Sequence, residues 1–362
     1  MAEDEFIHTI AEELDIDVLE SEKPEVSANG VTNVLIKTIY PLNGQYRAYV
    51  VKDPSLESSS LEESATLASF YNSQFVSRIL TLNKVSGPFG KHEVCLRLID
   101  DKVQTMHSVF VTKVDPGHRK KVLSLDDLCE VAKAVAKYHF INETVVSTEV
   151  FRAITENHSH ITEYDENNLQ KVIRILERSL HTPDRNYFSS PSQVMSKVNY
   201  LVEKVKRRGK PPVKDDVPLV LCHGKLNASS LLFEDSELKE ITNWENTHFA
   251  DHAKDLAHLI ISTADPEVRR SSYLSVFRSY YYTLVDVRPP HFEIELLRDQ
   301  YLQYQKNIVL SEIDPLLYEL SIDNAEDVRK RLVRRWESAL DDAYTYESEE
   351  YISDNEDCLF SK

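Results

Sequence analysis

The feature that most constrains the fold is a change of hydrophobic periodicity at Asp115-Pro116-Gly117. Before this turn, apolar residues alternate with polar ones over short runs, which is typical of β-strands. After it, apolar residues recur every three or four positions over long segments, which is typical of amphipathic helices. This pattern predicts an α+β chain in which a β-rich part is followed by a larger helical part.

The β-rich part has the order strand, strand, helix, strand, strand. Two β-like runs within residues 31–52 are separated by Asn43-Gly44, a dipeptide typical of tight hairpins. Residues 61–80 have helical periodicity, and their large apolar side chains fall on one face: Leu67, Phe70, Tyr71, Phe75 and Ile79. Two more β-like runs lie within residues 92–114. We expect a small antiparallel sheet that carries one helix.

The helical part begins with Ser124, which has Asp127 three positions later and so resembles a capping box. Helical patterns then dominate the chain, and the aromatic residues Phe277 and Tyr280–Tyr282 are interpreted as core and groove lining. We predict four segments, namely an acidic extension with a short helix and a loop (1–27), an N-lobe (28–115), a helical C-lobe (116–346) and an acidic, disordered tail (347–362).

Composition argues against several classes of function. The formal net charge is −18, whereas binding to nucleic acid or to an anionic membrane needs clustered Lys and Arg. The N-terminal residues are acidic, unlike a signal peptide, and no run approaches the roughly 20 apolar residues of a membrane span. The four cysteines have no CxxC spacing, which fits a reducing compartment. We predict a cytoplasmic protein with no nucleic-acid and no membrane partner.

One basic run, Arg329–Arg331 followed by Arg334 and Arg335, interrupts the acidic pattern. Acidic residues flank it, so we interpret the run as a solvated helix face. A docking patch is the alternative interpretation.

Five short stretches occur in an order that resembles a known group of enzymes. His223–Leu232, HGKLNASSLL, resembles the HGDLWxxNIL catalytic loop of the choline-kinase-like and ecdysteroid-kinase-like small-molecule kinases. Ile241–Trp244 resembles their IIDW metal-binding strand, and Asp251–Leu259 resembles the PxxDLAxL helix start that follows. Upstream, Leu123–His139 is similar to the helix that ends in LAxLH, and Ala48–Pro54 is similar to the VVLKxP strand.

The resemblance extends from about Val31 to Tyr344 and depends on the order and spacing of several weak motifs. It implies the bilobal protein-kinase-like fold shared with aminoglycoside phosphotransferases, with a small antiparallel-sheet N-lobe carrying one helix and a larger helical C-lobe. It also implies ATP-dependent phosphotransfer to a small molecule, with Lys52 as the lysine that contacts the nucleotide.

The chain departs from the family pattern at the positions that would carry the chemistry. Lys225 stands where the family has the aspartate that acts on the acceptor hydroxyl. Ser230 replaces an asparagine metal ligand, and Asn243 replaces the aspartate that holds magnesium. His223 keeps the family residue, and we interpret it as holding the loop through hydrogen bonds. These four are the candidate catalytic positions, three of them degenerate, and no metal site is predicted.

Electrostatics decides how much these replacements matter. Phosphoryl transfer depends on cations that neutralise the transferring group, and a general base contributes about 10²–10⁴-fold. A lysine at Lys225 repels Mg²⁺, by roughly several kcal/mol for charges about 5 Å apart at an effective dielectric of ~20. We therefore predict a pseudokinase with a binding or regulatory role. Lys225 could instead bind phosphate directly, so the expected ligand is a nucleotide or another small molecule, with ATP bound without magnesium or no cofactor required. A protein partner also fits this role.

Two other interpretations stay open, so enzymatic activity is undecided at this point. The first is an active small-molecule phosphotransferase with a rearranged metal site, for which the displaced carboxylates are Asp235, Glu245 and Asp251. The second is a metal-dependent hydrolase that uses residues at metal-ligand spacing, namely His248, His252, Asp255 and His258. A helix is expected to start within this group, which would leave His248 outside it, and Asp255 suits a structural role as acceptor of backbone donors.

Overall fold

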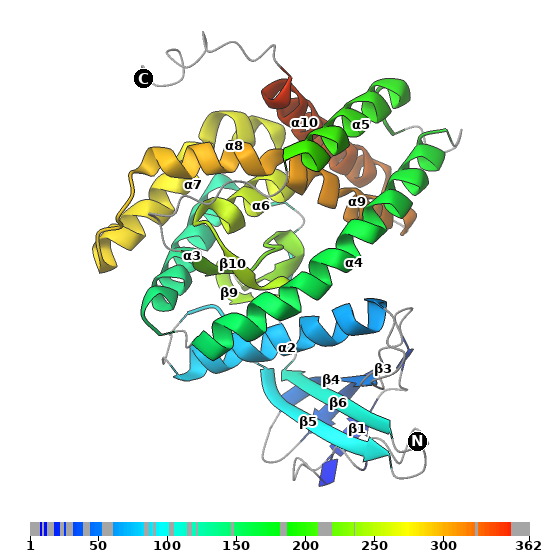
Figure 1. Ribbon diagram of the computed structural model, residues 1–362, viewed down its shortest axis with the longest axis vertical. Coiled ribbons are helices and arrows are strands. Elements are labelled where there is room, and N and C mark those ends of the chain that lie inside the picture. Colours follow the sequence, from blue (N-terminus) through cyan, green and yellow to red (C-terminus); the bar gives the residue numbers. More distant parts are fainter. Residues whose placement is uncertain are drawn as a thin grey trace. The chain divides into compact units, whose positions relative to one another are not determined.

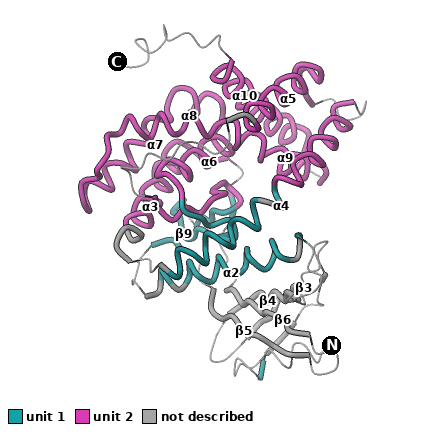
Figure 2. The backbone as a smooth tube through the Cα atoms, in the orientation of Figure 1, with its two compact units in different colours: residues 1–119, 144–165, 230–249 teal, residues 120–143, 166–229, 250–362 magenta. Residues whose placement is uncertain are grey.

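The computed structural model (Figure 1) describes residues 8, 11–12, 61–82, 87–89, 118–120, 122–145, 148–181, 187–208, 219–234, 236–322 and 325–348. It also describes the strand backbones within the first 113 residues. The chain divides into two compact units (Figure 2), the first formed by residues 1–119, 144–165 and 230–249. The second unit holds residues 120–143, 166–229 and 250–362.

The first unit contains an antiparallel sheet of six strands in the order β1-β3-β4-β6-β5, with β2 paired to β3. Its strands are β1 (Val18–Ser21), β2 (Glu25–Val26), β3 (Thr32–Thr38), β4 (Gly44–Lys52), β5 (His92–Asp100) and β6 (Thr105–Lys113). The helix α2 (Leu61–Leu82) lies between β4 and β5 in the chain. The predicted order of strand, strand, helix, strand, strand is confirmed.

The predicted loop within residues 1–27 needs a correction, because Val18–Ser21 and Glu25–Val26 are strands, whereas residues 8, 11 and 12 are helical as predicted. Both pair with β3 antiparallel, on the edge that β4 does not use. Without them this edge would present unpaired backbone groups. Charged residues are common on such edge strands, so the acidic composition concealed the strand character of the segment.

The predicted apolar face of α2 also needs a correction. Leu67, Phe70, Tyr71, Phe75 and Ile79 are all half-buried, and the face with the least exposed surface is that of Ala65, Ala68, Asn72 and Val76. The short helix η3 (Trp244–Asn246) packs against α2, where small side chains permit a close approach. Asn72 Nδ2 donates to the carbonyl oxygen of Thr247 at 3.0 Å. A buried amide thus fixes this contact.

The first unit also contains the hairpin of β8 (Leu231–Glu234) and β9 (Glu237–Ile241). It follows the short helix η2 (Ala228–Ser230), and β10 (His248–Ala250) comes after η3. Phe233 exchanges backbone hydrogen bonds with His118, at 3.0 Å and 2.9 Å. The hairpin is therefore tied to the segment where the periodicity of the sequence changes.

The second unit is mostly helical. Its elements include α3 (Leu125–Val145), α5 (Pro191–Arg208), β7 (Val220–Cys222), α6 (Ala253–Thr263), α7 (Pro266–Val287), α8 (Ile294–Ser311), α9 (Ile313–Ser321) and α10 (Glu326–Glu347). The long helix α4 (Thr148–Leu180) begins in the first unit and ends in the second. None of the helices that the structure describes combines the length and the apolar character needed to cross a membrane.

The start of α3 confirms the predicted capping box. The Asp127 carboxylate accepts from the backbone N–H of Ser124 at 2.9 Å, and the Asp127 N–H donates to the Ser124 hydroxyl at 3.2 Å. Lys120 Nζ donates to the same carboxylate at 2.7 Å. These reciprocal bonds satisfy donors that the first turn of a helix leaves open.

Candidate functional site

The loop that resembles a catalytic loop begins directly after β7 and is held by one buried carboxylate. The backbone N–H of His223 donates to Asp255 Oδ2 at 2.7 Å, and that of Gly224 donates to Oδ1 at 2.9 Å. Gly224 has φ of 91°, a conformation that side chains with a Cβ disfavour. The structural role predicted for Asp255 is confirmed, and the ring of His223 is buried as well.

Charge stabilises this anchor. Burial alone would raise the pKa of Asp255, but the hydrogen bond and charge of His139, the charge of His223 and the Gly224 N–H outweigh it and lower the pKa to about 2. An ionised carboxylate that accepts backbone donors makes the stronger, charge-assisted kind of hydrogen bond. The geometry of the loop thus depends on a side chain outside the loop.

Lys225 lies in the same unit and is half-buried. Its charge acts on Glu312, His258 and Lys254. Lys254 has a lowered pKa, first because it is buried and also because Lys225 repels its charge. The charges of two lysines therefore act on each other beside the loop, and Lys254 Nζ lies 4.8 Å from the centre of the Tyr304 ring.

Two carboxylates in the same unit as this loop, Asp251 and Asp255, are engaged by other groups. Asp251 is 5% exposed and accepts from the Tyr304 hydroxyl at 2.7 Å. Its pKa is raised, chiefly by burial. Asp255 binds the loop backbone as described above. These two carboxylates hold the protein together and do not present an open pair of oxygens.

Ser230 and Asn243 meet at one end of the β8–β9 hairpin, in the first unit. The backbone N–H of Thr242, next to Asn243, donates to the carbonyl oxygen of Ser230 at 2.8 Å. Ser230 is buried, whereas Asn243 is exposed and has φ of 64° and ψ of 53°. Asn and Asp are the side chains with a Cβ that tolerate this left-handed conformation best, so the backbone accommodates either of them at this position.

The structure places the other predicted residues separately. Lys52 ends β4, where its backbone is paired with His107, but its side chain lies outside the described residues. His248 is in β10 and thus outside α6, as expected. Its Nδ1 bonds the Asn246 carbonyl oxygen at 2.8 Å, and His258 Nδ1 bonds that of Leu226 at 3.2 Å. These side chains are held by nearby carbonyl groups.

A buried polar network escaped the sequence analysis. The hydroxyl of Tyr280 lies 2.7 Å from Nδ1 of His139 and 2.7 Å from Nδ1 of His252, and His139 Nε2 lies 3.3 Å from Asp255 Oδ2. Burial lowers the pKa of His252 to about 3, so its ring is neutral at neutral pH. The available signal was His139 at the end of a helix similar to LAxLH, but Tyr280 was interpreted only as core.

Part of this network has the composition of a metal site. Ligand atoms of His139, Cys222 and Asp255 lie within 4.8 Å of one another, and no other such cluster of three occurs among the described residues. Both oxygens of Asp255 and both nitrogens of His139 are already hydrogen-bonded. Burial raises the pKa of Cys222, whose thiol lies 3.6 Å from the Asp251 carbonyl oxygen. The donor set fits a hydrogen-bonded core rather than a metal.

Comparison with known proteins identifies a family. The DUF1679 family model, described as "Uncharacterized oxidoreductase dhs-27", matches residues 100–350. No curated protein matches the chain in sequence.

Several solved structures share the fold at low sequence identity. An amicoumacin kinase in complex with AMP-PNP, Ca²⁺ and its antibiotic has a TM-score of 0.53 at 12% identity, with 94% of each chain covered. The spectinomycin phosphotransferase APH(9)-Ia has a TM-score of 0.53 at 14% identity, covering 94% of this chain and 98% of that one. The phosphotransferase APH(2")-IIIa has a TM-score of 0.50 at 14% identity, covering 92% and 98%. The predicted α+β protein-kinase-like fold is confirmed.

Proposed function

Since the chain belongs to the DUF1679 family, whose model covers more than half of it, and has a kinase-like fold, we propose that it is a pseudokinase. In this proposal the protein descends from small-molecule kinases of the choline-kinase-like and ecdysteroid-kinase-like type. It has a binding or regulatory role and performs little or no phosphotransfer. The proposal does not include the oxidoreductase activity named in the family description. The reason is that the 7 glycines of the chain nowhere form the GxGxxG spacing of a dinucleotide-binding loop.

The observation that carries the proposal is the position of Lys225. It follows the His223-Gly224 turn, which Asp255 holds by two backbone hydrogen bonds. A carboxylate placed here could take a proton or attract a divalent cation, whereas an ammonium group can do neither. Lys254 adds a second positive charge nearby. The backbone of the loop is therefore firmly held, although Lys225 can neither accept a proton nor attract a divalent cation.

The same two lysines suggest what the loop could bind. Lysine is an effective point-charge ligand for phosphate and needs no metal to act as one. We propose that Lys225, assisted by Lys254, binds the phosphates of a nucleotide such as ATP in the absence of magnesium. Burial lowers the pKa of Lys254, and an anionic ligand would raise it again.

The rival proposal is an active phosphotransferase that uses displaced carboxylates. Of its three candidates, Asp235 lies outside the described residues and Glu245 is half-buried. Asp251 is buried against Tyr304, and moving it toward a metal would break that bond. Asp251 therefore gives this rival little support.

A thermal-shift titration with ATP separates the two proposals. We expect ATP in excess EDTA to raise the melting temperature, because a ligand that binds only the folded state stabilises it. Lys225→Ala should abolish the shift, while Lys206→Ala, which removes an exposed lysine of α5, should leave it unchanged. Stabilisation that requires Mg²⁺, or ATP turnover that survives Lys225→Ala, would favour the active enzyme. No response to ATP with or without Mg²⁺ would reject nucleotide binding and leave a role in protein interaction.

A complementary experiment restores the family residues. The triple variant Lys225→Asp, Ser230→Asn and Asn243→Asp should gain Mg²⁺ binding, measured by calorimetry, whereas Lys225→Asp alone should gain less. A triple variant that folds but binds no Mg²⁺ would show that the loss of function does not reside at these three positions.

A further inference from the structure

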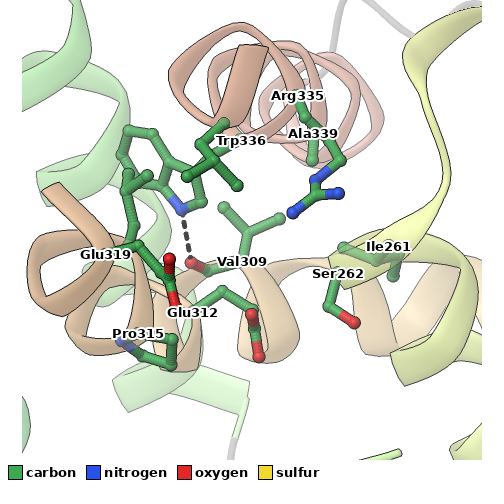
Figure 3. Close-up of a pocket in the computed structure, with 11 residues that line it drawn as sticks. Ile261, Ser262, Val309, Glu312, Pro315, Glu319, Arg335, Trp336 and Ala339 are labelled. Carbon is green, nitrogen blue, oxygen red and sulfur yellow. Dashed lines mark hydrogen bonds between the residues drawn. The ribbon is translucent and has the colours of Figure 1, made fainter. Parts of the chain in front are cut away.

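The second unit contains a pocket of about 70 Å³ that the proposed function does not use (Figure 3). It is bounded by α6, α8, α9 and α10, and thus lies wholly inside one unit. Its apolar walls are formed by Ile261, Val309, Leu316, Leu332, Trp336 and Ala339. The indole N–H of Trp336 donates to the Val309 carbonyl oxygen at 3.0 Å, so the ring presents only its apolar surface to the pocket.

Arg335 forms one side of the pocket. The basic run around Arg335 predicted a solvated helix face, but Arg335 is half-buried and its Nη1 donates to the Thr263 carbonyl oxygen at 3.2 Å. Burial lowers its pKa. Among the described residues, no carboxylate lies within 4.0 Å of this guanidinium. A planar group with five donors thus faces the pocket without an anionic partner in that part of the chain.

Glu312 forms the opposite side, at the turn between α8 and α9 (Figure 3). Its Oε1 lies 3.5 Å from Nε2 of His258, which counts as an ion pair by distance alone. The charges argue otherwise, because burial lowers the pKa of His258 to about 3 and raises that of Glu312 to about 7. His258 is therefore neutral with its hydrogen on Nδ1, its Nε2 faces Glu312 Oε1 as an acceptor, and Oε2 of Glu312 is left for another partner.

Arg335 and Glu312 influence each other electrostatically across the pocket but do not form an ion pair. Arg335 supplies a cation, and an approaching ammonium group would ionise the Glu312 carboxyl across the apolar-walled gap, so the pocket matches a molecule that carries both signs. We propose that this pocket binds a small zwitterion, with its carboxylate on Arg335, its ammonium group on Glu312 and its short carbon chain against Trp336.

The volume limits the size of this ligand. A cavity of about 150 Å³ encloses the six heavy atoms of benzene, so 70 Å³ holds about three heavy atoms, which matches the carbon chain of a short amino acid whose charged ends extend to Arg335 and Glu312. The pocket also adjoins the candidate site, because His258 bonds the Leu226 carbonyl oxygen at 3.2 Å and Leu226 follows Lys225. The proposal does not depend on nucleotide binding.

Titration of the full chain with a matched ligand series tests the proposal. Glycine, β-alanine and 4-aminobutyrate differ only in the distance between their charges, and propionate and propylamine each carry one of the two charges of β-alanine. Binding is followed by the indole ¹⁵N–¹H signals in NMR spectra, since the chain has only 2 tryptophans. We expect one of the amino acids to shift the Trp336 signal and leave the Trp244 signal in place, with an affinity at least about ten-fold above that of either single-charge analogue.

Variants assign the effect to the two charges. Arg335→Gln and Glu312→Gln should each reduce the affinity about ten-fold or more, whereas Arg331→Gln, on an exposed position of the same helix, should not. Circular dichroism reports whether each variant is folded, and Arg335→Lys replaces Arg335→Gln if the latter does not fold. Propionate or propylamine binding as well as β-alanine, or no shift of the Trp336 signal with any of the ligands, would overturn the proposal.

Discussion

The backbone anchor of the kinase-like loop and the side chain that follows it differ in how closely they match the kinase pattern. The anchor, which consists of Asp255 and the backbone of His223 and Gly224, lies in the buried interior and has all its hydrogen bonds in place. Lys225, which follows the anchor in the same unit, is half-buried. Backbone bonds to a buried carboxylate fix the path of the loop whatever side chain the loop presents to its surroundings. A kinase-like loop can therefore exchange its chemistry without losing its geometry.

The largest effect should come from breaking the anchor. Asp255→Ala removes the acceptor of two backbone N–H groups and the partner of His139, and should lower the free energy of unfolding by about 3–5 kcal/mol. Urea denaturation followed by circular dichroism measures this loss. Asp286→Ala, at an exposed position of α7, is the control and should change it by less than about 0.5 kcal/mol. Equal effects of the two substitutions would contradict the role of the anchor.

A smaller effect should come from Glu312, whose carboxyl is influenced by Lys225 and by Arg335 of α10, and lies beside His258 of α6. Its pKa is raised from 4.5 to about 7 in the folded state, so the folded state favours the protonated form. This stability is present below pH 4.5 and is lost as the pH rises through 7. The wild type should therefore lose up to about 3 kcal/mol relative to Glu312→Gln between pH 5 and pH 8.

Urea denaturation of both proteins at several pH values checks this sign. The opposite trend, with the wild type gaining stability relative to the variant as the pH rises, would show that Glu312 forms an ion pair in the folded protein. A difference in stability that stays constant with pH would show that the pKa of Glu312 is the same in the folded and unfolded states.

The smallest effect concerns the backbone at Asn243. Its φ of 64° suits glycine and asparagine better than alanine. Asn243→Ala should cost roughly 1 kcal/mol, whereas Asn243→Gly and Asn243→Asp should be close to neutral. Thermal denaturation of the three variants compares them directly. A larger loss for Asn243→Gly than for Asn243→Ala would mean that the amide group itself is bound.

The sequence predicted much of the fold because periodicity reports which faces are buried. It located the strands β3 to β6, the helix α2 and the capping box at Ser124. It missed β1 and β2, since their pairing with β3 is a long-range property that acidic composition hides. It chose the wrong face of α2 because large apolar side chains weigh most in a helical pattern, while Ala65, Ala68 and Asn72 pack closest.

The sequence predicted the carboxylate that holds the loop backbone, but it did not predict the side-chain contacts around that carboxylate. Asp255 was recognisable as a structural acceptor because its place in the DLAxL-like stretch implies a contact with the loop. The pairing of Tyr280 with two histidines joins residues from three separate helical segments, and no local pattern signals it. Arg335 looked like part of a solvated basic run because charge alone does not tell which side of α10 faces α6.

The hydroxyl of Tyr280 has one hydrogen for two histidine neighbours, so it must donate to one ring and accept from the other. When His139 is neutral and gives its Nε2 hydrogen to Asp255, the direction is settled: His252 donates to Tyr280, and Tyr280 donates to His139. A single hydrogen atom then dictates the tautomer of each imidazole. Tyr280→Phe would leave Nδ1 of His139 without a hydrogen-bond donor and the Nδ1–H of His252 without an acceptor. The three side chains therefore depend on one another, and none can be replaced alone without disrupting the other two.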